Sequence, residues 1–162
     1  MGIRRHLTLT VAAMLAAGAS YAATAAAQNQ LTTATGLRCT FALHATGAWN
    51  RSGVPDARVT PSTLVLIFDS INADEGTAKL RNGIAGTEIA FRLSGDYLHF
   101  MQSFRTGPLY TTTVFNQQTS EGRYKAVHSR HEQFTVPLPG ATSSPEQYYG
   151  ECSVAVQSVT GP

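Results

Sequence analysis

The sequence is poor in charge, in cysteine and in long apolar runs. Charged residues make up 14% of the 162 positions, and only two cysteines are present. No apolar stretch after residue 27 reaches the length of a membrane span, so no transmembrane segment is expected there. Internal repeats and low-complexity tracts are also absent from that part of the chain. What remains is a composition rich in Thr, Ser, Gly and Val, which favours an all-β domain.

The first 27 residues have the three-part pattern of an export signal. Basic Arg4 and Arg5 precede an apolar run over residues 7–17, and small residues follow as far as Ala27. We expect cleavage after Ala27, with sites two or five residues earlier and both general and twin-arginine export left open. The protein is then periplasmic or secreted, with a single domain over residues 28–162.

The charge balance bears on the choice of partner. Two of the 12 basic residues, Arg4 and Arg5, lie in the predicted signal, which leaves 10 basic residues against 10 acidic ones. The formal charge of residues 28–162 is therefore near zero. Nothing in this balance predicts nucleic acid or an anionic membrane surface as a partner.

Along residues 28–162 the hydrophobic period is two, and turn residues recur about every ten positions. The pattern predicts strands over residues 37–48, 63–71, 77–81, 87–93, 97–104, 109–115, 123–136 and 148–156. Residues 49–62 and 137–147 are predicted to be the long loops. Asn82-Gly83 predicts a tight hairpin between the third and fourth strands, because both residues tolerate positive φ.

Cys39 and Cys152 lie near opposite ends of the predicted domain, on the first and last strands. In an exported protein one disulfide is favoured over metal ligation. Such a bond ties the two strands together, which favours a single antiparallel meander of about eight strands closed as an up-and-down barrel. A two-sheet β-sandwich with the same pairing is the alternative. On the first strand, Cys39, Phe41 and Leu43 are expected to share the inner face.

Gly47-Ala48-Trp49, near the end of the first strand, is similar to the G-x-W of the lipocalin and avidin group of barrels. The resemblance implies a barrel that binds something small and apolar, with the tryptophan closing one end. We therefore expect Trp49 to be mostly buried there and to contribute to ligand binding. The chain from residue 28 also resembles short exported bacterial proteins.

The best candidate for a binding site lies on the long strand near the C-terminus. The period of two places six of its residues on one face: Tyr124, Ala126, His128, Arg130, Glu132 and Phe134. If Tyr124 marks the core side, the three polar side chains also point inward and need partners. Arg130 would hold an anionic or carbonyl group of a ligand, with His128 and Glu132 orienting it or exchanging protons. A bulge near Val127, or a purely structural salt bridge, is the rival interpretation.

Other chemistry has less support in the sequence. His128 and His131 are three residues apart on a predicted strand, so they point to opposite faces and a shared metal ion is not expected. Ser129 lacks the elbow motif of a serine hydrolase. No catalytic residue, metal or cofactor is therefore assigned.

The sequence thus predicts an exported β-barrel that binds a small, partly apolar or carboxylate-bearing ligand in its interior or open end. Two alternatives stay open: a filled barrel that contacts an envelope protein through its surface, and a small hydrolase or isomerase. An interior volume of about 300 Å³ or more would favour a ligand, and a filled core would favour a surface role.

Overall fold

The protein is described here by a computed structural model that covers residues 30–49, 52–82, 87–105, 107–132 and 144–155. The chain divides into two compact units, Met1–Thr33 and Ala34–Pro162. Of the first unit, residues 30–33 are described and contain a short helical turn, so the predicted export signal lies outside the described residues. In the described residues no helix has the length and hydropathy needed to cross a membrane.

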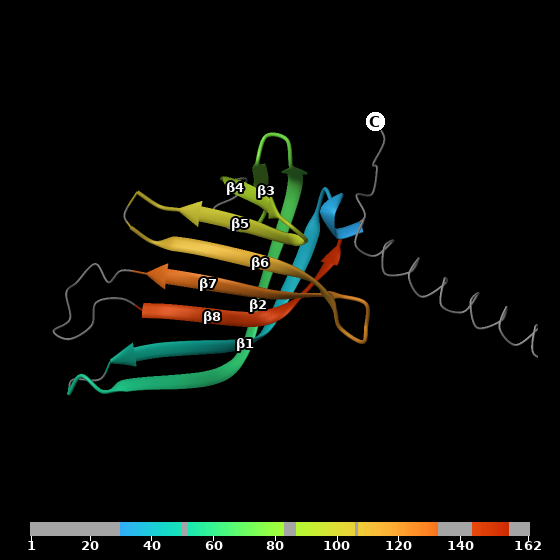
Figure 1. The fold of residues 1–162 in the computed structure, drawn as a ribbon. Coiled ribbons are helices and arrows are strands. Elements are labelled where there is room, and N and C mark those ends of the chain that lie inside the picture. The colour runs from blue at the N-terminus through green and yellow to red at the C-terminus, as the bar shows by residue number, and fades with distance from the viewer. Residues whose placement is uncertain (1–29, 50–51, 83–86, 106, 133–143, 156–162) are drawn as a thin grey trace, which may run out of the picture. The chain divides into compact units, whose positions relative to one another are not determined.

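The second unit is an antiparallel meander of eight strands (Figure 1). The strands are β1 Leu37–Trp49, β2 Pro55–Asn72, β3 Thr77–Leu80, β4 Thr87–Ser94, β5 Tyr97–Ser103, β6 Leu109–Gln118, β7 Tyr124–Glu132 and β8 Ser144–Val154. Each strand pairs with the next, and β8 pairs with β1, so hydrogen bonds close the sheet into a ring. The predicted all-β closed meander is confirmed, although its strands are not spread evenly round one axis.

The unevenness of the ring comes from β2. This strand pairs with β1 from Pro55 to Phe68 but with β3 only from Phe68 onward. Figure 1 shows β2 bending, so that its first half continues beside β1 away from β3 and β4. We call residues 43–49 of β1 and 55–61 of β2 the arm. Of the loop predicted over residues 49–62, the part from Pro55 onward is strand instead, because an edge strand tolerates Pro55 and Pro61, which lack a backbone donor.

A bulge in β1 reverses its two faces. Phe41 pairs with Gly150 and Leu43 with Tyr149, so Ala42 is an extra residue in β1. Phe41 is buried, but Leu43 is 41% exposed. The prediction that Leu43 shares the inner face is wrong, because one inserted residue moves every following side chain to the other side of the sheet.

Gly150 allows β1 and β8 to approach closely at this bulge. A Cβ atom at Gly150 would lie 2.0 Å from the carbonyl oxygen of Thr40 and 2.6 Å from the Cα atom of Phe41. Both of these are backbone atoms, which cannot move aside as the end of a flexible side chain can. Glycine is therefore required at this position because no larger residue fits between the two strands.

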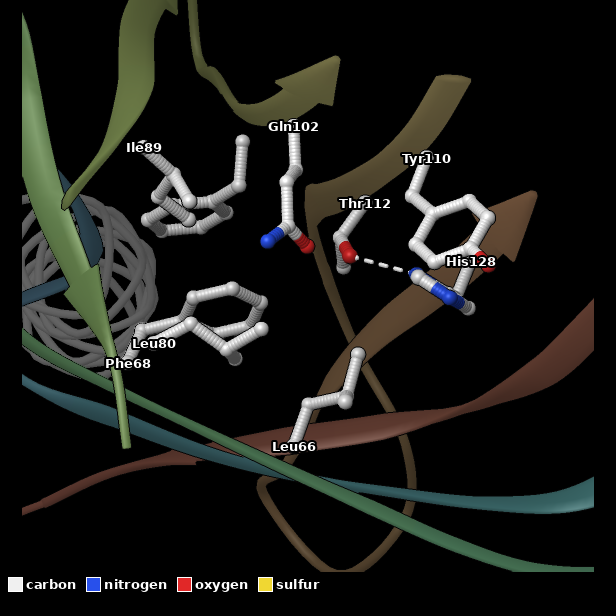
Figure 2. Close-up of a pocket in the computed structure, with 9 residues that line it drawn as sticks. Leu66, Phe68, Leu80, Ile89, Gln102, Tyr110, Thr112 and His128 are labelled. Carbon is white, nitrogen blue, oxygen red and sulfur yellow. Dashed lines mark hydrogen bonds between the residues drawn. The ribbon is translucent and has the colours of Figure 1, made fainter. Parts of the chain in front are cut away.

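The closed part of the ring has a packed aromatic core. Phe41, Phe68, Phe91 and Phe100 are among its most buried side chains, and the rings of Phe68 and Phe100 stack with centroids 4.0 Å apart. The space beside them that Figure 2 shows measures about 20 Å³. This volume accommodates one water molecule and no organic ligand. At this place the described core leaves no room for a ligand.

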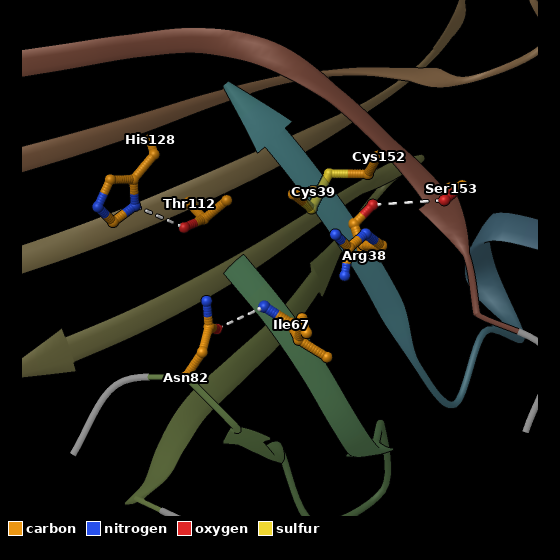
Figure 3. Close-up of a disulfide and its surroundings, with 8 residues drawn as sticks. All are labelled: Arg38, Cys39, Ile67, Asn82, Thr112, His128, Cys152 and Ser153. Atoms are coloured by element: carbon orange, nitrogen blue, oxygen red, sulfur yellow. Dashed lines mark hydrogen bonds between the residues drawn. A yellow bond between two sulfur atoms is a disulfide. The ribbon is translucent and has the colours of Figure 1, made fainter. Parts of the chain in front are cut away.

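The disulfide joins the first and last strands as predicted. Cys39 and Cys152 are directly opposite each other in the pairing of β1 with β8, their Cα atoms are 4.0 Å apart, and both are fully buried (Figure 3). The bond spans 113 positions. Such a bond is typical of proteins that fold in an oxidising compartment.

Asn82 completes the hydrogen bonding of β2 where β3 ends. The backbone N–H of Ile67 donates to Asn82 Oδ1 at 2.9 Å (Figure 3). Asn82 Nδ2 donates to the carbonyl oxygen of Val65. The amide side chain thus takes the place of a neighbouring strand for these two groups. The antiparallel pairing of β3 with β4 is confirmed, whereas Gly83, the second residue of the predicted turn, lies outside the described residues.

The last two strands differ from the prediction at their ends. β7 ends at Glu132 in the described residues, and residues 133–143 of the predicted strand and loop are outside them. β8 begins at Ser144, inside the predicted loop, because residues 144–147 pair with β7 as well as approaching β1. The early start of β8 places Glu146 in the sheet beside Arg130.

Candidate functional site

The inner face of β7 carries the polar residues that the sequence analysis selected. Tyr124 and Ala126 are each 2% exposed, His128 is 4% exposed, and Arg130 is half-buried. The pairing of β7 with β8 runs without a register shift. The inward orientation predicted for His128 and Arg130 is therefore confirmed, and no bulge occurs near Val127.

His128 is buried with both ring nitrogens hydrogen-bonded. Its Nδ1 lies 2.8 Å from Thr112 Oγ1, and Arg130 Nε donates to its Nε2 at 3.1 Å (Figure 2 shows the first contact). Since arginine Nε only donates, Nε2 accepts, and the ring proton sits on Nδ1 and is donated to Thr112. Burial and, second, the charge of Arg130 lower the pKa of His128 from 6.5 to about 4. The imidazole is thus neutral at pH 7 and positions Arg130.

Arg130 lies against two aromatic rings. Its guanidinium carbon is 5.2 Å from the ring centroid of Tyr110 on β6 and 5.1 Å from that of Tyr148 on β8, within the range of cation–π attraction. No carboxylate of the described residues forms an ion pair with Arg130. Glu146 is the cross-strand neighbour of Arg130 but contacts Tyr148 and His44 instead. The guanidinium is therefore held by flat rings and a neutral histidine, without a direct ion pair to a described carboxylate.

Tyr148 is itself fixed from two sides. Its hydroxyl donates to Glu146 Oε2 at 2.8 Å, and the ring of His44 on β1 stacks on it with centroids 4.4 Å apart and planes inclined by 12°. His44 Nε2 lies 3.7 Å from the same Glu146 oxygen. These contacts pre-orient the tyrosine ring that Arg130 covers.

Four flat side chains on neighbouring strands thus form one row. Its members, from β1 to β6, are His44, Tyr148, Arg130 and Tyr110, and all are half-buried. Beyond Tyr110 the ring of Phe104 makes an edge contact, with centroids 5.0 Å apart. We call these four residues the arginine row. It offers a ligand a cationic donor group bordered by apolar ring surface.

The structure separates the other residues that the sequence analysis selected. Tyr124 lies in the core opposite Cys152, four residues along β7 from His128. Trp49 is 49% exposed on the outer face of the arm. The side chain of Glu132 lies outside the described residues. Ligand binding by these three residues stays a prediction.

The expected burial of Trp49 at one end of the barrel is wrong. Two features of the fold explain its exposure. The bulge at Ala42 moves Trp49 to the face opposite His44, and the arm continues past the closed part of the ring. Without the bulge, the period of two would have placed Trp49 on the same side as Phe41.

Sequence reasoning missed three members of the arginine row. Tyr148 is on the same face of its strand as Cys152, which points inward, and Tyr110 is on the same face as Thr112. The period of two could therefore have identified both tyrosines. His44 had no such signal, since its inward direction depends on the bulge at Ala42. The opposite orientation of His128 and His131 is confirmed, because His131 is exposed.

Comparisons with known proteins assign no family to this chain. No family model matches it, and no curated protein and no solved structure matches it.

Proposed function

We propose that this protein is a binding module and that the arginine row takes a small, partly apolar ligand carrying a carboxylate or a similar anionic group. One observation carries the proposal: Arg130 is held over two tyrosine rings without a carboxylate partner among the described residues. A guanidinium binds a carboxylate with paired, charge-assisted hydrogen bonds. The adjoining rings supply apolar contact for the rest of the ligand.

The geometry supports binding outside the core, at the end of the sheet that carries the arginine row and the arm. We call this the open end, because β2 is paired there with β1 but not with β3. The described interior space of about 20 Å³ is too small for an organic ligand. The arginine row lies on the same inner face but is half-buried, so its side chains combine partial desolvation with access. Partial burial strengthens a charged hydrogen bond relative to one in open water.

We further propose that the protein is exported, with residues 1–27 removed, and is periplasmic or secreted. The buried disulfide supports this placement, since such bonds persist in oxidising compartments. An intact mass of protein recovered from the source organism that includes residues 1–27 would oppose it.

Binding can be tested with a series of straight-chain and aromatic monocarboxylates beside their methyl esters. Titration calorimetry is expected to show binding of some acids and weaker binding of the matching esters. Arg130→Gln keeps a donor for His128 but removes the charge, and should weaken acid binding by about tenfold or more. Arg38→Gln, at an exposed position on the outer face of β1, is the matched control. Equal affinity for acids and esters, or unchanged binding in Arg130→Gln, would contradict the proposal.

A further inference from the structure

The outer face of the arm is apolar along its whole length. After the bulge at Ala42, every second residue of β1 points outward, and the pairing with β2 places a second set beside it. The outward residues are Leu43, Ala45, Gly47 and Trp49 on β1, and Pro55, Ala57, Val59 and Pro61 on β2. None carries a charge or a side-chain hydrogen-bonding group except the indole N–H of Trp49.

The opposite face of the arm is largely polar. It carries His44, Thr46, Asp56, Arg58 and Thr60 at the intervening positions. In a sheet that covers a core, the apolar residues face the core and the polar residues face water. The arm has the reverse arrangement, which indicates that its outer face meets an apolar environment.

The apolar face is exposed in this structure. Val59 is 63% exposed, Trp49 49% and Leu43 41%. The face continues onto β8, where Tyr149 is paired with Leu43 and is 41% exposed. At the end of the arm, Trp49 and Pro145 border a hollow of about 250 Å³. Exposed apolar surface that is continuous in this way marks a contact site rather than scattered residues.

Two kinds of protein contact fit this face poorly. Pro55 and Pro61 interrupt the backbone donors of β2, which is the free edge of the arm, and so oppose the addition of a strand from another chain. The arm face is also small. The arm is only two strands, or about 10 Å, wide, whereas a stable interface buries about 800 Å² of accessible surface on each partner.

We propose that the outer face of the arm docks on the surface of an uncharged lipid layer. A lipid layer accepts a flat apolar patch of this size without requiring a complementary shape. Trp49 lies at the end of the patch, and tryptophan favours the boundary between apolar chains and water. The described outward positions carry no basic residue, so the contact that we propose does not require anionic headgroups. This inference does not depend on the arginine row.

The test uses Trp49 itself, because it is the single tryptophan of the chain. Vesicles of phosphatidylcholine brominated on the acyl chains quench a tryptophan only on contact with those chains. In the full chain, these vesicles are expected to quench Trp49 emission, and unbrominated vesicles to shift it to shorter wavelength. Because the readout is local, membrane binding by another segment does not produce it.

Adjacent substitutions on β2 separate the two faces of the arm. Val59→Asp places a charge on the outer face and should raise the lipid concentration for half-maximal quenching by about tenfold. Thr60→Asp places the same charge on the opposite face and should leave that concentration unchanged. Both positions are exposed, so neither substitution disturbs the core.

Three results would overturn the proposal. The first is absence of quenching, or equal quenching of the two variants. The second is quenching that requires anionic lipid and is abolished by salt, which would show that electrostatic attraction to the headgroups causes the binding. The third is Trp49 emission already shifted without lipid and dependent on protein concentration, which would assign the face to a contact between copies of the chain.

Discussion

The closed part of the ring and its open end share several strands but differ in chemistry. In the closed part, Phe68, Phe91 and Phe100 pack together, and the disulfide ties β1 to β8. At the open end, β1, β8, β7 and β6 carry the arginine row on the inner face, and β1 and β2 carry an apolar patch on the outer face. Two features produce this difference: the bulge at Ala42, and the pairing of β2 with β3 only from Phe68 onward. In this sheet, one segment of the strands thus stabilises the fold and the next is available for recognition.

The largest expected effect comes from breaking the closed part. Phe100 stacks on Phe68 and is 2% exposed, so Phe100→Ala should lower the free energy of unfolding by about 3–5 kcal/mol. Phe104→Ala makes the same chemical change at the half-buried open end and should cost less than half as much. Urea unfolding of both variants measures the difference. Equal losses would remove the distinction between the two regions.

Removing the disulfide should weaken the closure of the ring. Cys39→Ala combined with Cys152→Ala is expected to lower the free energy of unfolding by about 2–4 kcal/mol, because the unfolded chain regains the freedom of a loop of 113 positions. Carboxylate binding by the folded fraction should persist, since neither cysteine contacts the arginine row. Loss of binding at full folding would show that the two regions are coupled.

His128 lies between the two regions and should make stability depend on pH. Its pKa is about 4 when folded against 6.5 when unfolded. Between these values the unfolded chain takes up a proton that the folded chain does not, so stability falls as pH drops from 6.5 to 4, by about 3 kcal/mol in all. His128→Gln should flatten this part of the profile, whereas His131→Gln, on the exposed face, should retain it. A parent profile identical to that of His128→Gln would contradict the shift.

A smaller effect is expected where the closed part meets the bulge. Gly150→Ala brings a Cβ atom against the backbone of Thr40 and should cost about 1–3 kcal/mol. Gly47→Ala, in the arm, meets nothing within 4 Å and should be close to neutral. Thermal unfolding distinguishes the pair. A neutral Gly150→Ala would show that β1 and β8 can separate at this point.

The closed part of the fold could be predicted from the sequence more accurately than the open end. Alternating residues such as Phe41, Cys39 and Tyr124 identified strands, faces and the cysteine pairing, because their period reflects burial. Leu43 and Trp49 were misplaced because a single extra residue, Ala42, leaves no local signal but reverses the faces. The first half of β2 was missed because its prolines and exposed residues are typical of a loop as well as of an edge strand.

The residues of the candidate site were likewise predictable only where their strand is regular. His128 and Arg130 followed from the period of two on a regular strand, and the structure confirms their direction. The direction of His44 depends on the bulge, and the contact of Arg130 with Tyr148 depends on the register between β7 and β8. Pairing between strands distant in sequence determines such contacts, and one sequence does not display it.

The division between the two regions is tested most directly in one variant, Arg130→Gln, by measuring unfolding and carboxylate binding on the same sample. The account predicts that the free energy of unfolding changes by less than about 1 kcal/mol, since Arg130 is half-buried, lacks a described ion pair and glutamine retains a donor for His128. Carboxylate affinity should fall by about tenfold or more. A loss of several kcal/mol in stability with carboxylate affinity unchanged would show that the arginine row is structural, and would contradict the account.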